Sequence, residues 1–166
     1  MVKCILFDRD GTLGDLEDKR YPQTFRPYGD IKSVFAKLKS LGYIVGIITN
    51  QASIARGTAK NYDFDAEFKS YQADIWAICP HDDIDHCECR KPKSGLLLSI
   101  AERLHIPPQT CLVIGDRLSD IQCAKNANAS AVFVLTGKGK SEEEIVKTAY
   151  PSVPILTSFE DIFKIL

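Results

Sequence analysis

Two aspartates lie two residues apart near the N-terminus, in the segment Asp8-Arg9-Asp10-Gly11. The apolar run before them, residues 3–7, is typical of a buried strand, and Gly11 breaks the extended pattern. Both carboxylates can therefore converge on one point beyond the end of the strand. Two acids at such a point suit a divalent cation and a carboxylate nucleophile. These residues alone leave open a second interpretation, a plain Asp-Gly turn between a strand and a helix.

Two further apolar runs also end in polar residues. Residues 43–49 end at Thr49-Asn50, and residues 110–115 end at Gly115-Asp116. In an open parallel sheet the ligand site lies beyond the carboxyl ends of the strands, so these polar residues meet the first pair of acids at one edge. Three such strand ends predict a site there.

A cluster of cysteine and histidine residues begins at Cys79-Pro80-His81 and ends at Cys87-Glu88-Cys89. Three thiolates and one imidazole suit a tetrahedral zinc ion with no open position. His86 competes with His81 for the fourth place. The alternative interpretation is a set of unrelated thiols where a strand gives way to a loop.

Strand-like and helical patterns alternate along the whole chain. We expect strands at 3–7, 43–49, 75–79, 110–115, 131–135 and near 155, and helices over 31–41, over 94–105 and from 119. Ser141–Glu144 and Ser158–Asp161 place a capping hydroxyl three residues before an acid and should open two last helices. The alternation predicts an α/β fold, a doubly wound (Rossmann-like) parallel sheet in three layers, with residues 1–166 forming a single domain.

Composition and charge narrow the class of partner. The chain has 166 residues, of which 45% are hydrophobic and 26% charged, and its net charge is −1. No field of one sign recruits nucleic acid or a membrane surface. No apolar run approaches the length of a membrane span, and Met1-Val2-Lys3 leads directly into the first strand. We therefore expect a cytoplasmic monomer that binds neither nucleic acid nor membrane, with reduced cysteines available for metal.

The ordered set of these motifs resembles the haloacid dehalogenase (HAD) superfamily of phosphohydrolases. The matching residues are Asp8-Arg9-Asp10-Gly11-Thr12, Thr49-Asn50-Gln51, Lys91, and Gly115-Asp116 with Asp120. The segments 50–57 and 89–93 narrow the likeness to subfamily IIIA, the branch that contains heptose bisphosphate phosphatases and histidinol phosphatases. Each motif is weak alone, whereas the ordered set is specific.

The resemblance implies a division of catalytic roles. Asp8 would attack phosphorus to form an aspartyl-phosphate, and Asp10 would protonate the leaving oxygen and later deprotonate the attacking water. Thr49 would donate its hydroxyl to the phosphoryl oxygens, and Lys91 would neutralise their growing charge.

The resemblance also implies two metal ions. Mg²⁺ would be held by Asp8, the backbone carbonyl of Asp10 and Asp116, with Asp120 supporting these ligands from behind. Helix capping is the alternative role of Asp116 and Asp120. A structural Zn²⁺ would be held by four residues of a loop over about 79–89, namely Cys79, His81, Cys87 and Cys89. Because this loop directly precedes Lys91 in the chain, we expect the zinc to position the side chain of the catalytic lysine.

The segments 13–28 and 79–90 are too short for the cap domain that larger relatives carry, so we expect an open, capless site. The substrate-binding candidates are Asn50, Gln51, Ala52, Arg56 and Arg90, with Arg20 and Arg26 as further partners for a second anionic group. We expect the substrate to be a small phosphorylated metabolite. A sugar bisphosphate such as D-glycero-D-manno-heptose 1,7-bisphosphate is the first candidate, and histidinol phosphate is the second. A phosphatase for nucleic-acid 3′-ends and an inactive zinc-bearing binding module remain as alternatives.

Overall fold

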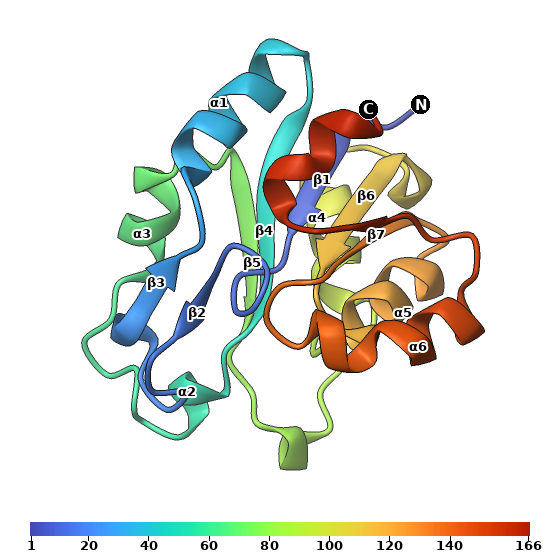
Figure 1. Ribbon diagram of the computed structural model, residues 1–166. Coiled ribbons are helices and arrows are strands. Elements are labelled where there is room, and N and C mark those ends of the chain that lie inside the picture. The colour runs from blue at the N-terminus through green and yellow to red at the C-terminus, as the bar shows by residue number, and fades with distance from the viewer.

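A six-stranded parallel sheet lies at the centre of the protein, in a computed structural model that describes residues 1–166 (Figure 1). Its strand order is β5-β4-β1-β6-β7-β8, and every neighbouring pair is parallel. The strands are β1 (Cys4–Phe7), β4 (Ile44–Asn50), β5 (Ile75–Cys79), β6 (Cys111–Gly115), β7 (Ser130–Val134) and β8 (Ile155–Leu156). All six strands overlap the predicted ranges, and the doubly wound α/β fold is confirmed.

Helices cover both faces of the sheet. One face packs against α1 (Ile31–Ser40), α3 (Phe64–Ser70) and the 3₁₀ segment η4 (Phe159–Lys164). The other packs against α4 (Gly95–Arg103), α5 (Leu118–Asn126) and α6 (Gly139–Ala149). The strands are apolar on both faces because each face is covered. None of the helices combines the length and the apolar composition that a membrane span needs.

The chain changes direction across the sheet at β1. The chain runs from β1 to β4 on one side and later returns to place β6 on the other, and Phe7 of β1 pairs in register with Ile47 and Ile114. The carboxyl ends of β1, β4 and β6 therefore lie side by side at the point where the winding reverses. Open α/β sheets bind ligands at this point.

The last two helices differ from the prediction. Helix α6 begins at Gly139, and the Ser141 hydroxyl donates to the carbonyl of Lys138 instead of capping a helix. Ser158 does open its segment with a capping box, but the segment is 3₁₀ in type. The predicted helix over 94–105 ends earlier, at Arg103, and His105 adopts a left-handed backbone conformation beyond it.

Several short elements were not predicted. An antiparallel hairpin, β2 (Gly14–Leu16) and β3 (Phe25–Pro27), occupies the region after the first motif and encloses the 3₁₀ turn η1 (Pro22–Thr24). We call residues 14–27 the flap. Helix α2 (Ala52–Ala55) follows β4, and 3₁₀ turns η2 (Asp83–Asp85) and η3 (Pro108–Thr110) lie in later loops. These elements are too short to carry a readable apolar period.

Phe35 on α1 provides a test of the packing beneath the site. Its ring is fully buried, with its centroid 5.1 Å from that of Phe7 on β1. We expect Phe35→Ala to lower the free energy of unfolding by about 3–5 kcal/mol, because the cavity cannot close completely. Urea denaturation measures this change. The exposed Lys32→Ala on the same helix is the control and should stay within about 0.5 kcal/mol of wild type. Equal losses in the two variants would contradict this view of the core.

Candidate active site and metal centre

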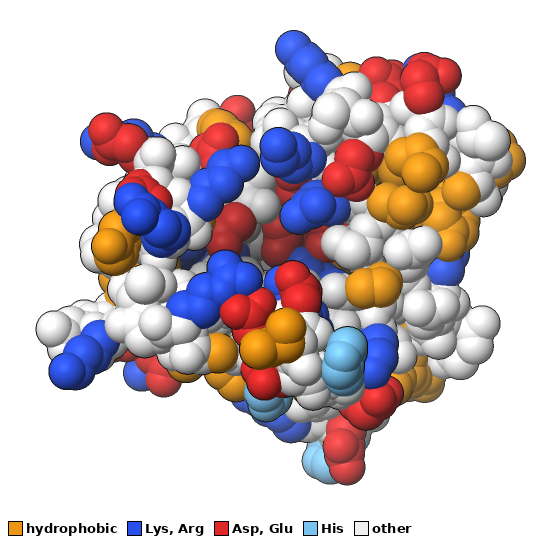
Figure 2. Space-filling model, turned by 90° about the horizontal axis from the view of Figure 1, so that it is seen from below, with side chains coloured by type: hydrophobic (Ala, Val, Ile, Leu, Met, Phe, Trp, Pro, Cys, Tyr) orange, Lys and Arg blue, Asp and Glu red, His pale blue; other side chains and the backbone are white.

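A cleft of about 430 Å³ opens beyond the carboxyl ends of β1, β4 and β6. Figure 2 shows acidic side chains at the bottom of a hollow, with Lys and Arg side chains around it. Only one of the fifteen lining residues is hydrophobic, so the cleft suits a highly polar ligand. The charged lining residues are Asp8, Asp10, Asp15, Asp116 and Asp120, together with Lys19, Arg90, Lys91, Arg117 and Lys138.

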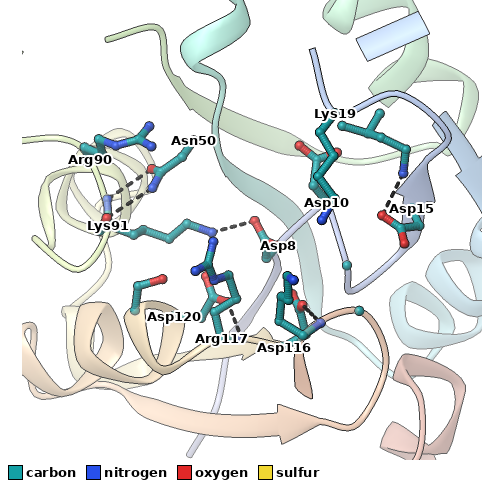
Figure 3. Close-up of a pocket in the computed structure, with 15 residues that line it drawn as sticks. Asp8, Asp10, Asp15, Lys19, Asn50, Arg90, Lys91, Asp116, Arg117 and Asp120 are labelled. Atoms are coloured by element: carbon teal, nitrogen blue, oxygen red, sulfur yellow. Dashed lines mark hydrogen bonds and ion pairs between the residues drawn. The ribbon is translucent and has the colours of Figure 1, made fainter. Parts of the chain in front are cut away.

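The side chain of Lys91 extends across the cleft toward Asp8 and Asp120 (Figure 3). Its Nζ atom is 2.5 Å from Oδ1 of Asp8 and 2.6 Å from Oδ1 of Asp120, and it also donates to the carbonyl of Ile48. Burial would lower the pKa of Lys91, but the charges of Asp120 and Asp8 outweigh it and raise the pKa above its usual value. The lysine therefore stays charged at every physiological pH.

Asp116 is the third buried acid of this cluster, beside the two that bind Lys91. Oxygen atoms of Asp8, Asp116 and Asp120 lie within 4.8 Å of one another. Burial is the largest cause that raises the pKa of Asp8 well above its ordinary value. Burial and the charge of Asp120 raise the pKa of Asp116 to about 7. The excess of negative charge gives the cluster a strong preference for a cation.

Two glycines make room around Asp116. A Cβ atom on Gly11 or Gly137 would collide with the Asp116 carboxylate, and both glycines have positive φ angles, of 95° and 51°. Asp116 also accepts hydrogen bonds from the Thr12 hydroxyl and the backbone N–H of Lys138. A set of carboxylate oxygens fixed in this way fits a hard divalent cation such as Mg²⁺.

Asp10 is held by a donor on each oxygen. Arg9 Nη1 is 2.6 Å from Oδ1, and Gln51 Nε2 is 2.7 Å from Oδ2. Gln51 also donates to the hydroxyl oxygen of Thr49, so these three side chains form one chain of hydrogen bonds. Burial raises the pKa of Asp10, against the opposing effects of Arg9 and Gln51.

The residues predicted to bind substrate separate into two groups. Asn50 and Arg90 line the cleft, whereas Gln51, Ala52 and Arg56 do not. The Asn50 amide accepts from the backbone N–H of Lys91 and donates to its carbonyl, and so it positions the catalytic candidate directly.

The other arginines form ion pairs outside the cleft. Arg56 binds both oxygens of Asp82 at 2.5 and 2.6 Å, which ties it to the cysteine-rich loop. Arg20 pairs with Asp18, and Arg26 pairs with Glu17. Both ion pairs are exposed and lie within the flap. Neither of these two lines the cleft.

Three cations of the cleft were not predicted from the sequence: Lys19, Arg117 and Lys138. Arg117 directly follows the Asp116 motif, and this adjacency was an available signal. Lys19 and Lys138 come from loops that fold back toward the strand ends, and no spacing in the chain indicates this.

The cysteine and histidine side chains also converge. The Sγ atoms of Cys79 and Cys89 lie 3.6 and 3.4 Å from Sγ of Cys87, and His81 Nδ1 lies 3.7 and 3.3 Å from Sγ of Cys79 and Cys89. A tetrahedral zinc ion with ordinary bond lengths would separate its ligand atoms by roughly 3.5–3.8 Å. His86 does not belong to the group. The protein therefore has a Cys₃His cluster of the size and geometry that a closed metal site requires.

The surroundings of Cys87 favour a thiolate. Burial would raise its pKa, but the backbone N–H of Arg90 and the neighbouring thiols lower the pKa to about 7. Arg90 in turn pairs with Asp83 and donates to the carbonyl of His81. The loop is thus bonded to the residue that precedes Lys91. The other cysteines, Cys4, Cys111 and Cys123, are buried in the core.

Comparison with known proteins agrees with the fold and the cleft. A family model described as HAD-hydrolase-like matches residues 88–162. The chain is 32% identical to the D-glycero-beta-D-manno-heptose-1,7-bisphosphate 7-phosphatase of Pasteurella multocida, with 100% of this chain and 97% of the relative covered. It is 31% identical to the D-glycero-alpha-D-manno-heptose-1,7-bisphosphate 7-phosphatase of Campylobacter jejuni, with 96% and 97% covered.

A solved structure gives the same result. The D,D-heptose 1,7-bisphosphate phosphatase from B. bronchiseptica, complexed with magnesium and phosphate, superposes with a TM-score of 0.84. The two chains are 26% identical, and 98% of this chain and 97% of the other are covered. The fold, the acidic cleft and these relatives define a phosphoric monoester hydrolase. The chain belongs to the HAD-like hydrolase family.

The raised pKa of Asp116 predicts how a metal ion should stabilise the protein. Between pH 4 and pH 7 the folded chain without metal binds a proton that the unfolded chain releases, so this contribution to stability falls as the pH rises. Below about pH 7 a cation must displace this proton before it can bind the Asp116 carboxylate, whereas above about pH 7 the carboxylate is already ionised. We therefore expect the increase in melting temperature caused by 5 mM Mg²⁺ to be roughly twice as large at pH 8 as at pH 5.5. Thermal scans at both pH values measure this increase. An increase at pH 5.5 that equals or exceeds the one at pH 8 would contradict the role of Asp116 as a ligand of the cation.

Proposed function

We propose that the protein is a Mg²⁺-dependent phosphatase of a small sugar bisphosphate, with D-glycero-D-manno-heptose 1,7-bisphosphate as its substrate. The observation that carries the proposal is the charge pattern of the cleft, acids and one lysine at its base and cations around its opening. The names of the relatives support the substrate. The magnesium in the B. bronchiseptica enzyme supports the metal.

In this proposal the chemistry divides between Asp8 and Asp10. Lys91 bonds Oδ1 of Asp8, and the other oxygen attacks phosphorus. The bond from phosphorus to the sugar oxygen breaks, and Asp10 gives that oxygen its proton. Water then attacks the aspartyl-phosphate, Asp10 takes back a proton, and free Asp8 and inorganic phosphate result.

Lys91 and Thr49 support the same two steps. Lys91 offsets the charge that grows on the phosphoryl oxygens, and burial strengthens this effect. We assign the Thr49 hydroxyl to one of those oxygens. Asp8, Asp116 and the backbone carbonyl of Asp10 would hold Mg²⁺, and Asp120 orients Lys91 behind them. When bound, the metal ion supplies positive charge that screens the phosphate from the buried acids.

The rim of the cleft supplies the second half of the substrate site. Lys19, Arg90, Arg117 and Lys138 line it, and each can contact an anionic group. A substrate with one phosphate at Lys91 has its second phosphate within this ring of cations. A sugar bisphosphate therefore fits the charge distribution better than a monophosphate does.

A panel of phosphate esters tests this assignment with Mg²⁺ present. We expect kcat/KM for heptose 1,7-bisphosphate to exceed that for histidinol phosphate and for a 3′-phosphorylated oligonucleotide by at least about tenfold, which corresponds to one added ionic contact. Both anomers of the bisphosphate should be measured, because the relatives include enzymes named for each. A higher kcat/KM for either of the other esters would reject the sugar bisphosphate.

Asp8→Asn is the control for this panel. The substitution keeps the volume of the side chain and removes the nucleophile, so all turnover should cease while the melting temperature stays close to or above that of wild type. Stability holds because the variant removes one of three crowded acids. Retention of a tenth of wild-type activity would contradict covalent catalysis through Asp8.

We further propose that Cys79, His81, Cys87 and Cys89 bind one structural Zn²⁺. The spacing of their ligand atoms supports this, and so does the preference of thiolates for soft metals over Mg²⁺. The ion would fix residues 79–89 and thereby Arg90 and Lys91. A closed Cys₃His set leaves no coordination position for a substrate.

Substitution within the cluster provides the test. We expect Cys87→Ser to lose the metal, to lower the melting temperature by about 5–10 °C and to reduce activity, since zinc affinity contributes folding free energy. Elemental analysis of the freshly purified protein should find about one zinc per wild-type chain. Cys123→Ala, which removes a thiol outside the cluster, should keep the zinc. Wild-type protein that carries no zinc, yet is fully stable and active after chelation and return of Mg²⁺, would reject the site.

A further inference from the structure

Arg9 lies between the two catalytic candidates in the chain, but its side chain turns away from the cleft. It is the largest fully buried side chain in the protein and does not line the cleft. A guanidinium group remains charged in the interior, so it requires partners for its N–H groups. Its nitrogens donate hydrogen bonds to Asp10, Pro22, Tyr62 and Glu67. The rings of Phe25 and Phe64 also contact the guanidinium, with Phe25 the nearer.

Glu67 on α3 holds the guanidinium from the side opposite to Asp10. Its Oε1 is 2.9 Å from Arg9 Nε, and its Oε2 is 2.9 Å from Arg9 Nη2. The hydroxyls of Tyr62 and Tyr71 donate to the same carboxylate, at 2.6 and 3.1 Å. Glu67 is thereby fixed by four donors and stays outside the cleft.

This two-pronged contact determines where the remaining nitrogen points. A carboxylate bound through Nε and Nη2 fixes the plane of the guanidinium, and Nη1 is then the only nitrogen directed at Asp10. Two contacts from the flap hold the same plane. The centroid of the Phe25 ring is 4.0 Å from Cζ of Arg9, and the carbonyl of Pro22 accepts from Nη2. Asp10 is therefore oriented by a rigid group whose own orientation is set on α3.

We propose that Glu67 is a positioning residue for Asp10 and acts through Arg9. The inference rests on the proposed role of Asp10 as the proton donor to the leaving group. If Glu67 served only to stabilise the fold, its substitution would affect all substrates alike. Because Asp10 also serves the hydrolysis of the aspartyl-phosphate, which all substrates share, the informative quantity is kcat/KM, which reports only the steps up to release of the alcohol. A positioning role instead predicts a defect in kcat/KM confined to esters whose leaving group needs a proton.

Glu67→Gln tests this with two substrates, glycerol 3-phosphate and p-nitrophenyl phosphate, in the full-length protein with Mg²⁺. The amide keeps the shape of the side chain but can accept from only one of the two Arg9 nitrogens. We expect kcat/KM for glycerol 3-phosphate to fall about tenfold, because a misplaced acid loses part of the ~10²–10⁴-fold effect of proton transfer. The nitrophenolate leaves without a proton, so its kcat/KM should fall less than about threefold.

Three variants make the result decisive. Asp65→Asn on the same helix removes a negative charge that does not contact Arg9 and keeps an oxygen that accepts from Trp76 Nε1, so it should leave both kcat/KM values unchanged. Asp10→Asn should show the same substrate dependence of kcat/KM as Glu67→Gln, but more strongly. Glu67→Asp keeps the charge with a shorter reach and takes the place of Glu67→Gln if that variant does not fold.

The outcomes separate the two proposals. Equal losses of kcat/KM for both esters in Glu67→Gln, or no loss, would overturn the positioning role when Asp10→Asn shows the expected dependence. If Asp10→Asn itself lowers kcat/KM equally for both esters, the proposed role of Asp10 as the proton donor fails, and the inference about Glu67 fails with it.

Discussion

The structure depends on the burial of three carboxylates around a single ammonium group. Asp8, Asp116 and Asp120 are each nearly inaccessible to water, and Lys91 is the one cation that contacts two of them directly. Charges taken out of water are costly unless they are paired, and one lysine cannot balance three acids. Burial, together with the charge of the neighbouring acids, raises the pKa values of Asp8 and Asp116, and the same excess of negative charge favours a cation in the cleft. The cost of burying these acids and their attraction for a cation thus have the same physical origin.

The elements around the cluster hold its members in place from several directions. Strands β1 and β6 bring Asp8 and Asp116 to the same edge of the sheet, and the end of β4 contributes Asn50, which binds the backbone of Lys91 on both sides. Arg90, which precedes Lys91, bonds Asp83 and the carbonyl of His81 in the cysteine-rich loop. Arg9 and Glu67 connect Asp10 to α3 and to the flap. Each catalytic candidate therefore has a support outside the cleft.

The sequence predicted the sheet and the base of the cleft well, because both depend on local patterns. Buried parallel strands are continuous apolar runs, and Asp8, Asp10 and Asp116 stand at fixed offsets from them. The rim was not predictable in this way. Arg56 carries the same charge as Arg90, yet it binds Asp82 while Arg90 lines the cleft. Glu67 lies 58 residues from Arg9 on an element with no readable period. Such pairings are decided by the folded surface and by no spacing in the chain.

The winding of the sheet also determines when the site can form. Strand β1 occupies the middle of the sheet, but its neighbour β6 begins only at Cys111, and the bond from Thr12 to Asp116 joins residues 104 positions apart. Contacts between segments so distant in the chain close large loops and form slowly. A nascent chain that has emerged from the ribosome only through β5 holds Asp8 and Asp10 but neither Lys91 nor the two later acids. Assembly of the charged cluster is therefore coupled to the completion of the sheet, and the protein acquires its reactive centre among its last folding events.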